Sequence, residues 1–287
     1  MAKQFTVQDF FKRFPDDDSC LAHLMKTRYG ETLDCPKCAK EGRFVRLAKL
    51  PAYSCPWCGH HIHPMAGTPF EDTRTPLQKW FYAMYLFTTT RHGVPAKELQ
   101  RQLGVTYKTA WRIGHEIRKY MADVDGDDNL SGHVEVDEVY IGGKRPGKHG
   151  RGAAGKTIVF GMLERGGNVI TRVVPNVRRA TLEAIILEKI RAGTTISSDE
   201  WHSYRALAMR GYKHGVVTHS AEQWVDGIHH TNSLEGFWSH LKRSILGTHI
   251  SVSAKHMSKY LGEFEYRYNM RDMPSFMFAR LLLSFSA

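Results

Sequence analysis

Three acidic residues in the second half of the chain have the type and spacing needed for metal-dependent chemistry. Asp137 lies in the alternating stretch HVEVDEVYIGG, which predicts a strand, and Asp199 follows the strand-like residues of TTISSD. Glu235 lies in HHTNSLEGFWSHLKR, which predicts a loop entering a helix. Carboxylates brought close together repel each other, and a divalent cation relieves that repulsion. A set of oxygen ligands favours Mg²⁺ or Mn²⁺, so we expect these three residues to bind one of them.

Lys242 follows Glu235 by seven residues, or about two helical turns, so both project from one helix face. On its own, a glutamate and a lysine on one face are typical of an ordinary solvated helix. If Asp137 and Asp199 meet Glu235, however, Lys242 is placed to contact a DNA phosphate near the reacting bond.

The elements that must bring these residues together are predicted for residues 131–287. Their order is three strands, a helix, a strand, a helix, a possible strand and a long helix, which is the order of an RNase H-like α/β domain. In such a sheet the first and fourth strands are neighbours and the late helix packs over them, so the three carboxylates can converge. The last apolar stretch, FMFARLLLSF, is expected to pack on the same core.

Four of the five cysteines form two CxxC pairs separated by sixteen residues. Two such turns can direct four thiolates at one point, and the spacing is typical of a zinc ribbon. We therefore predict a ribbon over residues 31–66 with a structural Zn²⁺. A thioredoxin-like redox pair is the competing interpretation, and a nearby histidine could replace one cysteine. The predicted zinc ligands are Cys35, Cys38, Cys55 and Cys58.

Residues 75–121 are helical by pattern, and residues 1–30 predict two short amphipathic helices. Two helices, near 95–102 and 106–120, are separated by a short turn containing Gly104, which is typical of a helix-turn-helix. The alternative is an ordinary helical hairpin. The DNA-contacting residues predicted at the start of the second helix are Thr106, Tyr107, Lys108, Thr109 and Arg112.

The chain has 287 residues and a formal net charge of +11, a balance that favours a polyanionic partner such as nucleic acid. A Gly-rich basic loop follows the first predicted strand, but it lacks the GxxxxGK[ST] order of a nucleotide-binding loop. We expect the loop to contact a DNA backbone through Lys144, Arg145, Lys148 and Arg151. No stretch of 18 apolar residues and no signal-peptide core are evident, so we predict no membrane contact and a cytoplasmic location.

These motifs, in this order, resemble DDE-type insertion-sequence transposases of the bacterial branch that carries an N-terminal zinc ribbon. The resemblance covers nearly the whole chain. The segments that carry it are CPKC and CPWC, GTPFEDTRTPLQKWFYAM, LQRQLGVTYKTAWR, EVDEVYIGGK, SSDEWHSYRAL and HHTNSLEGFWSHLKR.

The resemblance implies a multidomain protein, with a zinc ribbon and a helix-turn-helix followed by an RNase H-like catalytic domain. It implies metal-dependent cleavage at the inverted-repeat ends of a transposon, transfer of the 3′-hydroxyl into target double-stranded DNA, and homo-oligomers on the DNA of the bacterial nucleoid. Matched by position, the catalytic residues are Asp137, Asp199 and Glu235, with Lys242 as the basic follower. This branch uses either Glu or Asn as its third residue, so Asn232 is the alternative to Glu235. A non-catalytic transcription regulator and an RNase H-like nuclease are the other functions compatible with the residues.

Overall fold

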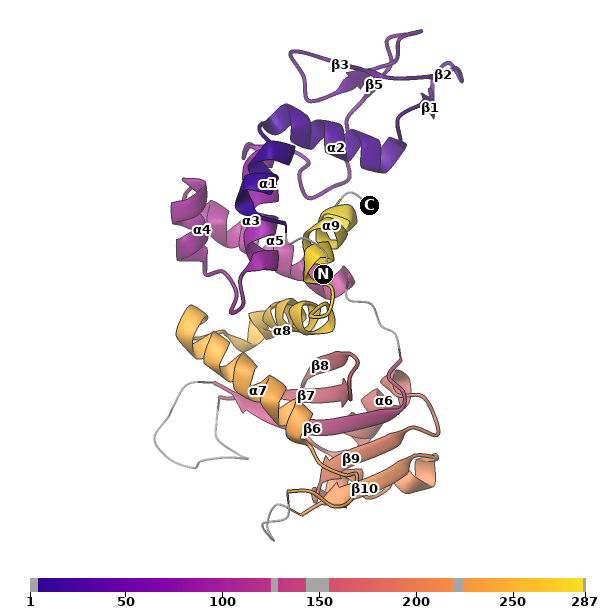
Figure 1. The fold of residues 1–287 in the computed structure, drawn as a ribbon, viewed down its shortest axis with the longest axis vertical. Helices are drawn as coiled ribbons and strands as arrows, with labels where there is room; N and C mark the ends of the chain where they lie inside the picture. The colour runs from indigo at the N-terminus through magenta and orange to yellow at the C-terminus, as the bar shows by residue number, and fades with distance from the viewer. Residues whose placement is uncertain (1–4, 125–128, 143–154, 219–223, 286–287) are drawn as a thin grey trace. The chain divides into compact units, whose positions relative to one another are not determined.

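The computed structural model describes residues 5–124, 129–142, 155–218 and 224–285. The chain divides into two compact units (Figure 1). The first unit combines residues 1–90 and 96–120 with residues 273–287, and the second unit contains residues 91–95 and 121–272. The basic-loop residues predicted to contact DNA, Lys144, Arg145, Lys148 and Arg151, lie outside the described residues.

The first unit is built mainly from helices whose starts are fixed by local hydrogen bonds. Thr6 and Asp9 form a capping box at one helix, and Asp16 and Ser19 form a second one at the next. A large aromatic core lies between the helices and includes Trp80, which is fully buried. The helices of this unit are α1 (Val7–Arg13), α2 (Asp17–Tyr29), α3 (Leu77–Thr89), α4 (Ala96–Leu103), α5 (Tyr107–Val124, whose last residues belong to the second unit) and α9 (Pro274–Phe285).

Five two-residue strands between α2 and α3 form two small antiparallel sheets. In each sheet the strands are too short to bury a core of their own, so the residues between them are held chiefly by turns. These strands are β1 (Leu33–Asp34), β2 (Glu41–Gly42), β3 (Val45–Arg46), β4 (Tyr53–Ser54) and β5 (His61–Ile62).

The sequence led us to expect that the last helix packs on the core of the α/β domain. This expectation is wrong, because α9 packs in the first unit. Its Phe278 lies against Phe10 and Tyr85, and its Phe285 stacks with Phe70 at a centroid distance of 5.6 Å. The physical reason is that α1, α3 and the chain around Phe70 present an aromatic surface that matches the Phe-rich face of α9. The pattern of α9 specified an apolar face but not its partner.

The second unit contains a five-stranded mixed sheet in the order β10-β9-β6-β7-β8. Strands β6, β7 and β8 form antiparallel pairs, whereas β6 pairs in parallel with β9, and β9 with β10. The first and fourth strands of this unit are therefore neighbours. The strands are β6 (His133–Ile141), β7 (Thr157–Glu164), β8 (Val169–Val174), β9 (Thr195–Asp199) and β10 (Lys213–Val217).

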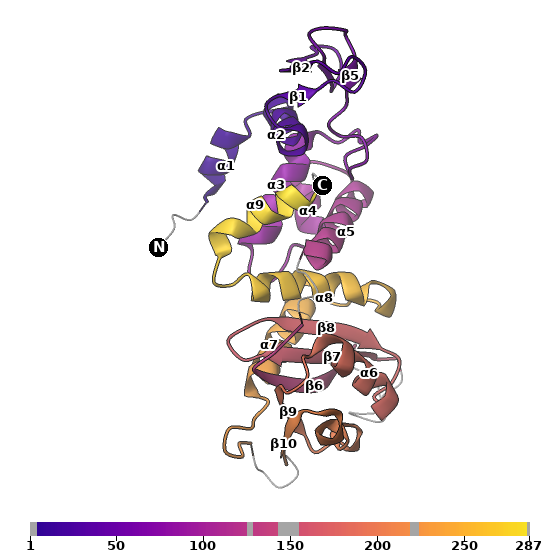
Figure 2. The same cartoon turned by 90° about the vertical axis from the view of Figure 1, so that its right-hand side faces the viewer.

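Helices cover both faces of this sheet (Figure 2). Alternate residues of β6 point to opposite faces, so Val134 and Val136 join a core with α6 (Arg179–Lys189), whereas Val139 joins a core with α7 (Asn232–Ser244) and α8 (Ala254–Asn269). The predicted helix after Asp199 forms only two short 3-10 segments, His202–Tyr204 and Leu207–Arg210. A π-helical turn, Ile245–His249, extends α7.

Within the described ranges, no helix has the length and apolar character needed to cross a membrane.

Candidate functional site

The four cysteines of the two CxxC turns gather at one point in the first unit. All four sulfur atoms lie within 4.8 Å of one another, with 3.6 Å between Cys35 and Cys58 and 3.8 Å between Cys38 and Cys55. A tetrahedral zinc site with Zn–S bonds of about 2.3 Å places its sulfurs roughly 3.8 Å apart, so this arrangement fits Zn²⁺. Burial opposes ionisation of the Cys35 thiol, but the backbone N–H groups of Cys38 and Lys37 and the neighbouring thiols lower its pKa to about 6. Four thiolates leave no open position, which makes the site structural.

Asp137 and Asp199 lie side by side on two neighbouring strands of the second unit. Strands β6 and β9 are parallel, and their last paired residues are Glu135 and Ser197. Each aspartate follows its paired residue by two positions, so both carboxylates stand at one level and on the sheet face covered by α7. The order of the elements predicted that these two strands are neighbours, and the strand register puts both aspartates at one level.

The carboxyl group of Asp137 is held largely in its neutral form by its surroundings. Burial first, and then the neighbouring carboxylates of Glu138 and Asp199, together raise its pKa to about 8. Glu138 points to the other sheet face, where its carboxylate accepts a hydrogen bond of 2.6 Å from the buried hydroxyl of Tyr204. A strongly raised carboxyl pKa beside a second aspartate is a mark of functional sites.

Trp238 on α7 reaches down to Asp137. Its indole N–H donates a hydrogen bond of 3.1 Å to the Asp137 carboxylate. The ring has room because Gly161, which pairs with Asp137 across β6 and β7, has no side chain; a Cβ atom there would overlap the indole. The local pattern of α7 does not indicate this contact of Trp238. The unexpected glycine in the middle of the β7 sequence was the available signal of a close approach.

Glu235 and Asn232 occupy different environments at the start of α7. Asn232, the first residue of the helix, is exposed, whereas Glu235 is partly buried and accepts a hydrogen bond of 2.9 Å from the Thr231 hydroxyl. Glu235 lies three residues before Trp238, which contacts Asp137. Lys242 is exposed further along the helix. Of the two candidates for the third catalytic residue, Glu235 is the more buried one.

The three carboxylates are not gathered as tightly as the four cysteines. Among the described residues, the cysteines are the set of potential ligands with all atoms within 4.8 Å. Each carboxylate instead accepts a hydrogen bond from the protein: Asp137 from Trp238, Asp199 from the Trp201 backbone N–H at 3.0 Å, and Glu235 from Thr231. Mutual repulsion between carboxylates favours such separate donors.

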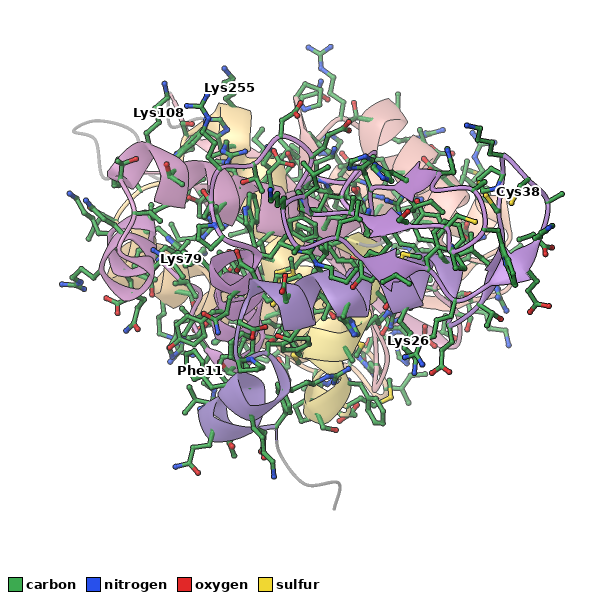
Figure 3. All side chains as sticks on the ribbon, turned by 90° about the horizontal axis from the view of Figure 1, so that it is seen from above. Phe11, Lys26, Cys38, Lys79, Lys108 and Lys255 are labelled. Carbon is green, nitrogen blue, oxygen red and sulfur yellow. The ribbon has the colours of Figure 1, made fainter. Side chains whose placement is uncertain are left out.

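The predicted DNA-contacting residues lie where α5 begins. Gly104, at a φ of +59°, makes the turn between α4 and α5, and the Thr106 hydroxyl caps α5 by accepting the Thr109 N–H at 3.2 Å. Tyr107, Lys108 and Arg112 are exposed, and Figure 3 shows Lys108 directed away from the ribbon. Next to them Trp111 is 38% exposed, an aromatic residue at this surface that the sequence analysis did not single out.

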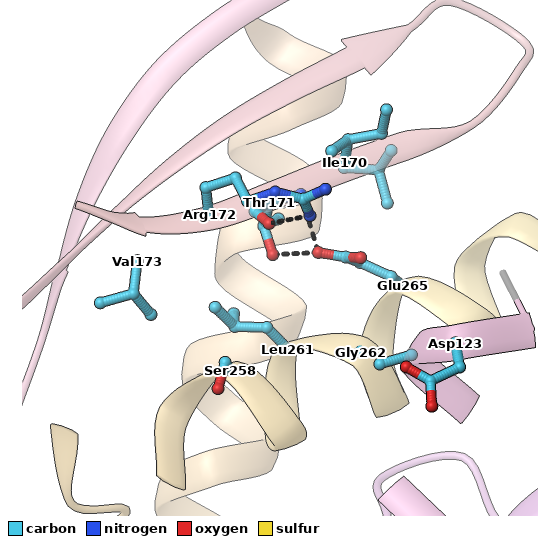
Figure 4. Close-up of a pocket in the computed structure, with 11 residues that line it drawn as sticks. Asp123, Ile170, Thr171, Arg172, Val173, Ser258, Leu261, Gly262 and Glu265 are labelled. Carbon is cyan, nitrogen blue, oxygen red and sulfur yellow. Dashed lines mark hydrogen bonds between the residues drawn. The ribbon is translucent and has the colours of Figure 1, made fainter. Parts of the chain in front are cut away.

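A cavity of about 410 Å³ lies along β8, the edge strand farthest in the sheet from β9, which carries Asp199. Figure 4 shows Glu265 of α8 directed at Thr171, whose backbone N–H donates to the Glu265 carboxylate at 2.7 Å. The Asn269 side chain similarly accepts a hydrogen bond from the Val169 N–H and donates one to the Val169 carbonyl. These side chains satisfy the outer edge of β8, so we assign the cavity to edge protection and not to the carboxylate site.

Comparison with known proteins places these features in a family. The model of the ISXO2-like transposase domain matches residues 129–269, and that of the transposase zinc-ribbon domain matches residues 15–61. An "Uncharacterized protein in transposable element ISH50" from Halobacterium salinarum is 27% identical over 278 residues, which cover 89% of this chain and 92% of that protein. An "Uncharacterized transposase-like protein" from Haemophilus influenzae is 33% identical over 107 residues, which cover 37% of this chain and 85% of that protein. The chain therefore belongs to the family of ISXO2-like transposases, with a transposase zinc ribbon ahead of the transposase domain.

Proposed function

We propose that this protein cuts DNA at the ends of an insertion sequence and joins the freed 3′-hydroxyl to target DNA. The observation that carries the proposal is the pair Asp137 and Asp199, which stand level on neighbouring parallel strands under α7. Counted from β6 in chain order, the sheet runs third, second, first, fourth, fifth, which supports an RNase H-like catalytic domain.

In this proposal Asp137, Asp199 and Glu235 hold Mg²⁺ or Mn²⁺ through carboxylate oxygens, and the donor set fits such hard cations. Bound there, a pair of these cations would activate the attacking hydroxyl and stabilise the leaving oxygen of the phosphodiester. Because its pKa is raised, Asp137 holds a proton near neutral pH, and it would lose that proton when a cation binds to the carboxylate. Lys242, exposed on α7, contacts a phosphate of the bound DNA strand.

The first unit supplies DNA recognition in this proposal. Helices α4 and α5 act as a helix-turn-helix, with Thr106, Tyr107, Lys108, Thr109 and Arg112 placed to reach base edges and phosphates. The zinc ribbon at 31–66 stabilises this part of the chain and adds contacts to the inverted repeat. The functional domains are then the N-terminal helices (1–30), the ribbon (31–66), the helix-turn-helix (75–121) and the catalytic part beginning near residue 131, and two or more copies act together on paired ends.

The test uses the purified zinc-loaded chain and DNA carrying the inverted repeats that bracket its gene. Asp137→Asn and Asp199→Asn should each lower Mg²⁺-dependent cleavage and strand transfer by about a hundredfold or more, with end binding unchanged. Asp272→Asn is the matched control, because its side chain is 81% exposed in the same unit, and it should behave as wild type.

Two results would overturn the proposal. A wild-type protein that binds the ends but never cuts them in Mg²⁺ or Mn²⁺ would support a transcription regulator. A protein that cuts RNA or arbitrary DNA equally well without the repeats would support a nuclease. Strand joining that survives in Asp199→Asn would show that the metal-site assignment is wrong even if the protein is a transposase.

A further inference from the structure

A buried ion pair joins strand β6 to the chain around the start of α7, two residues before Asp137. Glu135 has no exposed surface, and its carboxylate lies 2.8 Å from the Nε of Arg165, which directly follows β7. Neither residue belongs to the proposed metal-binding set. A charge buried this completely must have several hydrogen-bond donors around it.

Besides Arg165 and the nearby His230, whose Nδ1 lies 3.1 Å from the carboxylate, two donors to Glu135 come from the first turn of α7. One carboxylate oxygen accepts the Leu234 backbone N–H at 2.9 Å, and the other accepts the Ser233 hydroxyl at 2.9 Å. The side chain of the N-cap residue of α7, Thr231, makes no capping bond, and its hydroxyl donates to Glu235. The strand therefore provides the cap that the helix lacks, with a negative charge at the positive end of the helix dipole.

Arg165 connects the same carboxylate to the chain entering α7. Its Nη1 donates to the Ile228 carbonyl at 2.6 Å and its Nη2 to the His230 carbonyl at 3.0 Å. The planar guanidinium can satisfy these acceptors in one fixed geometry, which a lysine ammonium cannot do. Together Glu135 and Arg165 join β6, the turn after β7 and the segment before α7.

Helix and strand are thus fixed at two successive points. Glu135 holds Leu234, and two residues later Asp137 accepts from Trp238, four residues further along α7. Two strand residues advance about 7 Å and four helical residues about 6 Å, so the spacing of the two contacts on the strand matches their spacing on the helix. Glu235 lies between the two fixed points.

We propose that Glu135 and Arg165 are positioning residues that set the height and rotation of α7 and so place Glu235 relative to Asp137. The role of Glu235 as a metal ligand rests on the proposed function above. A buried ion pair contributes little net stability compared with apolar packing, but its hydrogen bonds are directional. Its loss should therefore change the geometry of α7 more than the stability of the whole chain.

The test compares Glu135→Gln and Arg165→Lys with wild type in two measurements. The first is hydrogen–deuterium exchange of residues 232–236 without added Mg²⁺, which we expect to become about tenfold faster in both variants. Glu135→Gln weakens the charged acceptor of the Leu234 N–H, and Arg165→Lys removes the guanidinium contacts that hold this carboxylate and the chain before α7 in place. The second is the Mg²⁺ concentration for half-maximal cleavage, which should rise about tenfold, as is typical when the support of a metal ligand is removed.

Glu183→Gln is the matched control. Glu183 is also a buried carboxylate with two arginine partners, Arg179 and Arg210, but it lies on α6 at the other sheet face. This variant should lose stability without changing α7 exchange or the Mg²⁺ requirement.

Wild-type exchange at residues 232–236 in Glu135→Gln would overturn the inference, as would an equal effect of Glu183→Gln on both measurements. If Glu135→Gln does not fold, the result for Arg165→Lys tests the inference, because this variant keeps the positive charge and removes only the planar guanidinium with its several donors. The exchange measurement needs no catalysis. A wild-type protein that never cleaves DNA would therefore contradict the proposed function while leaving this test intact.

Discussion

Asp137 carries a free-energy cost in the folded protein that depends on pH. Its pKa of about 8 in the folded state lies well above the ordinary value of 3.8, because burial and then Glu138 and Asp199 disfavour the charged form. The folded state thus binds this proton more tightly than the unfolded state. Stability from this group is fully present below pH 3.8 and is lost as the pH rises towards 8.

Asp137→Asn removes this ionisation and keeps an acceptor for the Trp238 indole. Without added Mg²⁺, the variant should match wild type near pH 4 and exceed it at pH 8, by on the order of 1–3 kcal/mol in the free energy of unfolding. Urea unfolding at a series of pH values measures the difference. An advantage that is the same at pH 4 and pH 8 would show that the substitution acts through packing and not through the proton.

At the residue scale, the order of the elements was sufficient to predict that the strands of Asp137 and Asp199 are neighbours, because the first and fourth strands lie side by side in a sheet of this order. The hydrogen bond from Trp238 to Asp137 was not predictable. It depends on the missing side chain of Gly161, which lies on another strand and far from Trp238 in the sequence. The cap that Glu135 provides for α7 was not predictable either, because it required the strand and the helix to be placed together.

At the scale of the element, the zinc ribbon depends on its metal because each of its strands has only two residues. Few buried side chains support it, so the four sulfur–metal bonds must contribute much of its folding free energy. The ribbon was predictable because the spacing of its two CxxC pairs is visible in the sequence and needs no tertiary context.

A strong zinc chelator should therefore unfold residues 33–62 while leaving the sheet of the second unit protected. Hydrogen–deuterium exchange before and after chelation measures this, and added Zn²⁺ should restore the ribbon. Cys38→Ser should lower the zinc content per chain, whereas Cys20→Ala, which changes a buried cysteine on α2, should not. Unchanged exchange in the chelated ribbon would mean that packing alone maintains it.

Other elements show where local patterns stop being sufficient. The residues after Asp199 contain helix-forming side chains, yet they form two short 3-10 segments because Trp201, Tyr204 and Leu207 are drawn into the core with α6. Helix α9 was predicted as an apolar helix, but a periodic apolar face does not state which of two cores it will join.

At the scale of the whole molecule, the charge of +11 implies that DNA binding depends on salt. The logarithm of the affinity for inverted-repeat DNA should fall linearly with the logarithm of the salt concentration. Lys108→Gln should make that slope shallower by about one unit, because one phosphate contact is lost. Fluorescence anisotropy between about 50 and 200 mM salt covers the useful range.

Lys26→Gln is the matched control for this measurement. Lys26 is exposed on α2 and lies 2.6 Å from the carboxylate of Glu31, so it offers little charge to a phosphate. The two variants carry the same change in net charge. Equal slopes for Lys108→Gln and Lys26→Gln would show that overall charge, and not a contact at the start of α5, governs binding.

The placement of α9 also fixes an order of events during protein synthesis. Residues 1–90 pack against the Phe-rich face of α9, yet α9 is translated only after every residue of the second unit. Until α9 is made, the aromatic surface around Phe10 and Phe70 lacks the cover that Phe278 and Phe285 provide. An exposed surface of this kind is where a chaperone would bind, and a nascent chain interrupted before residue 273 cannot complete the first unit.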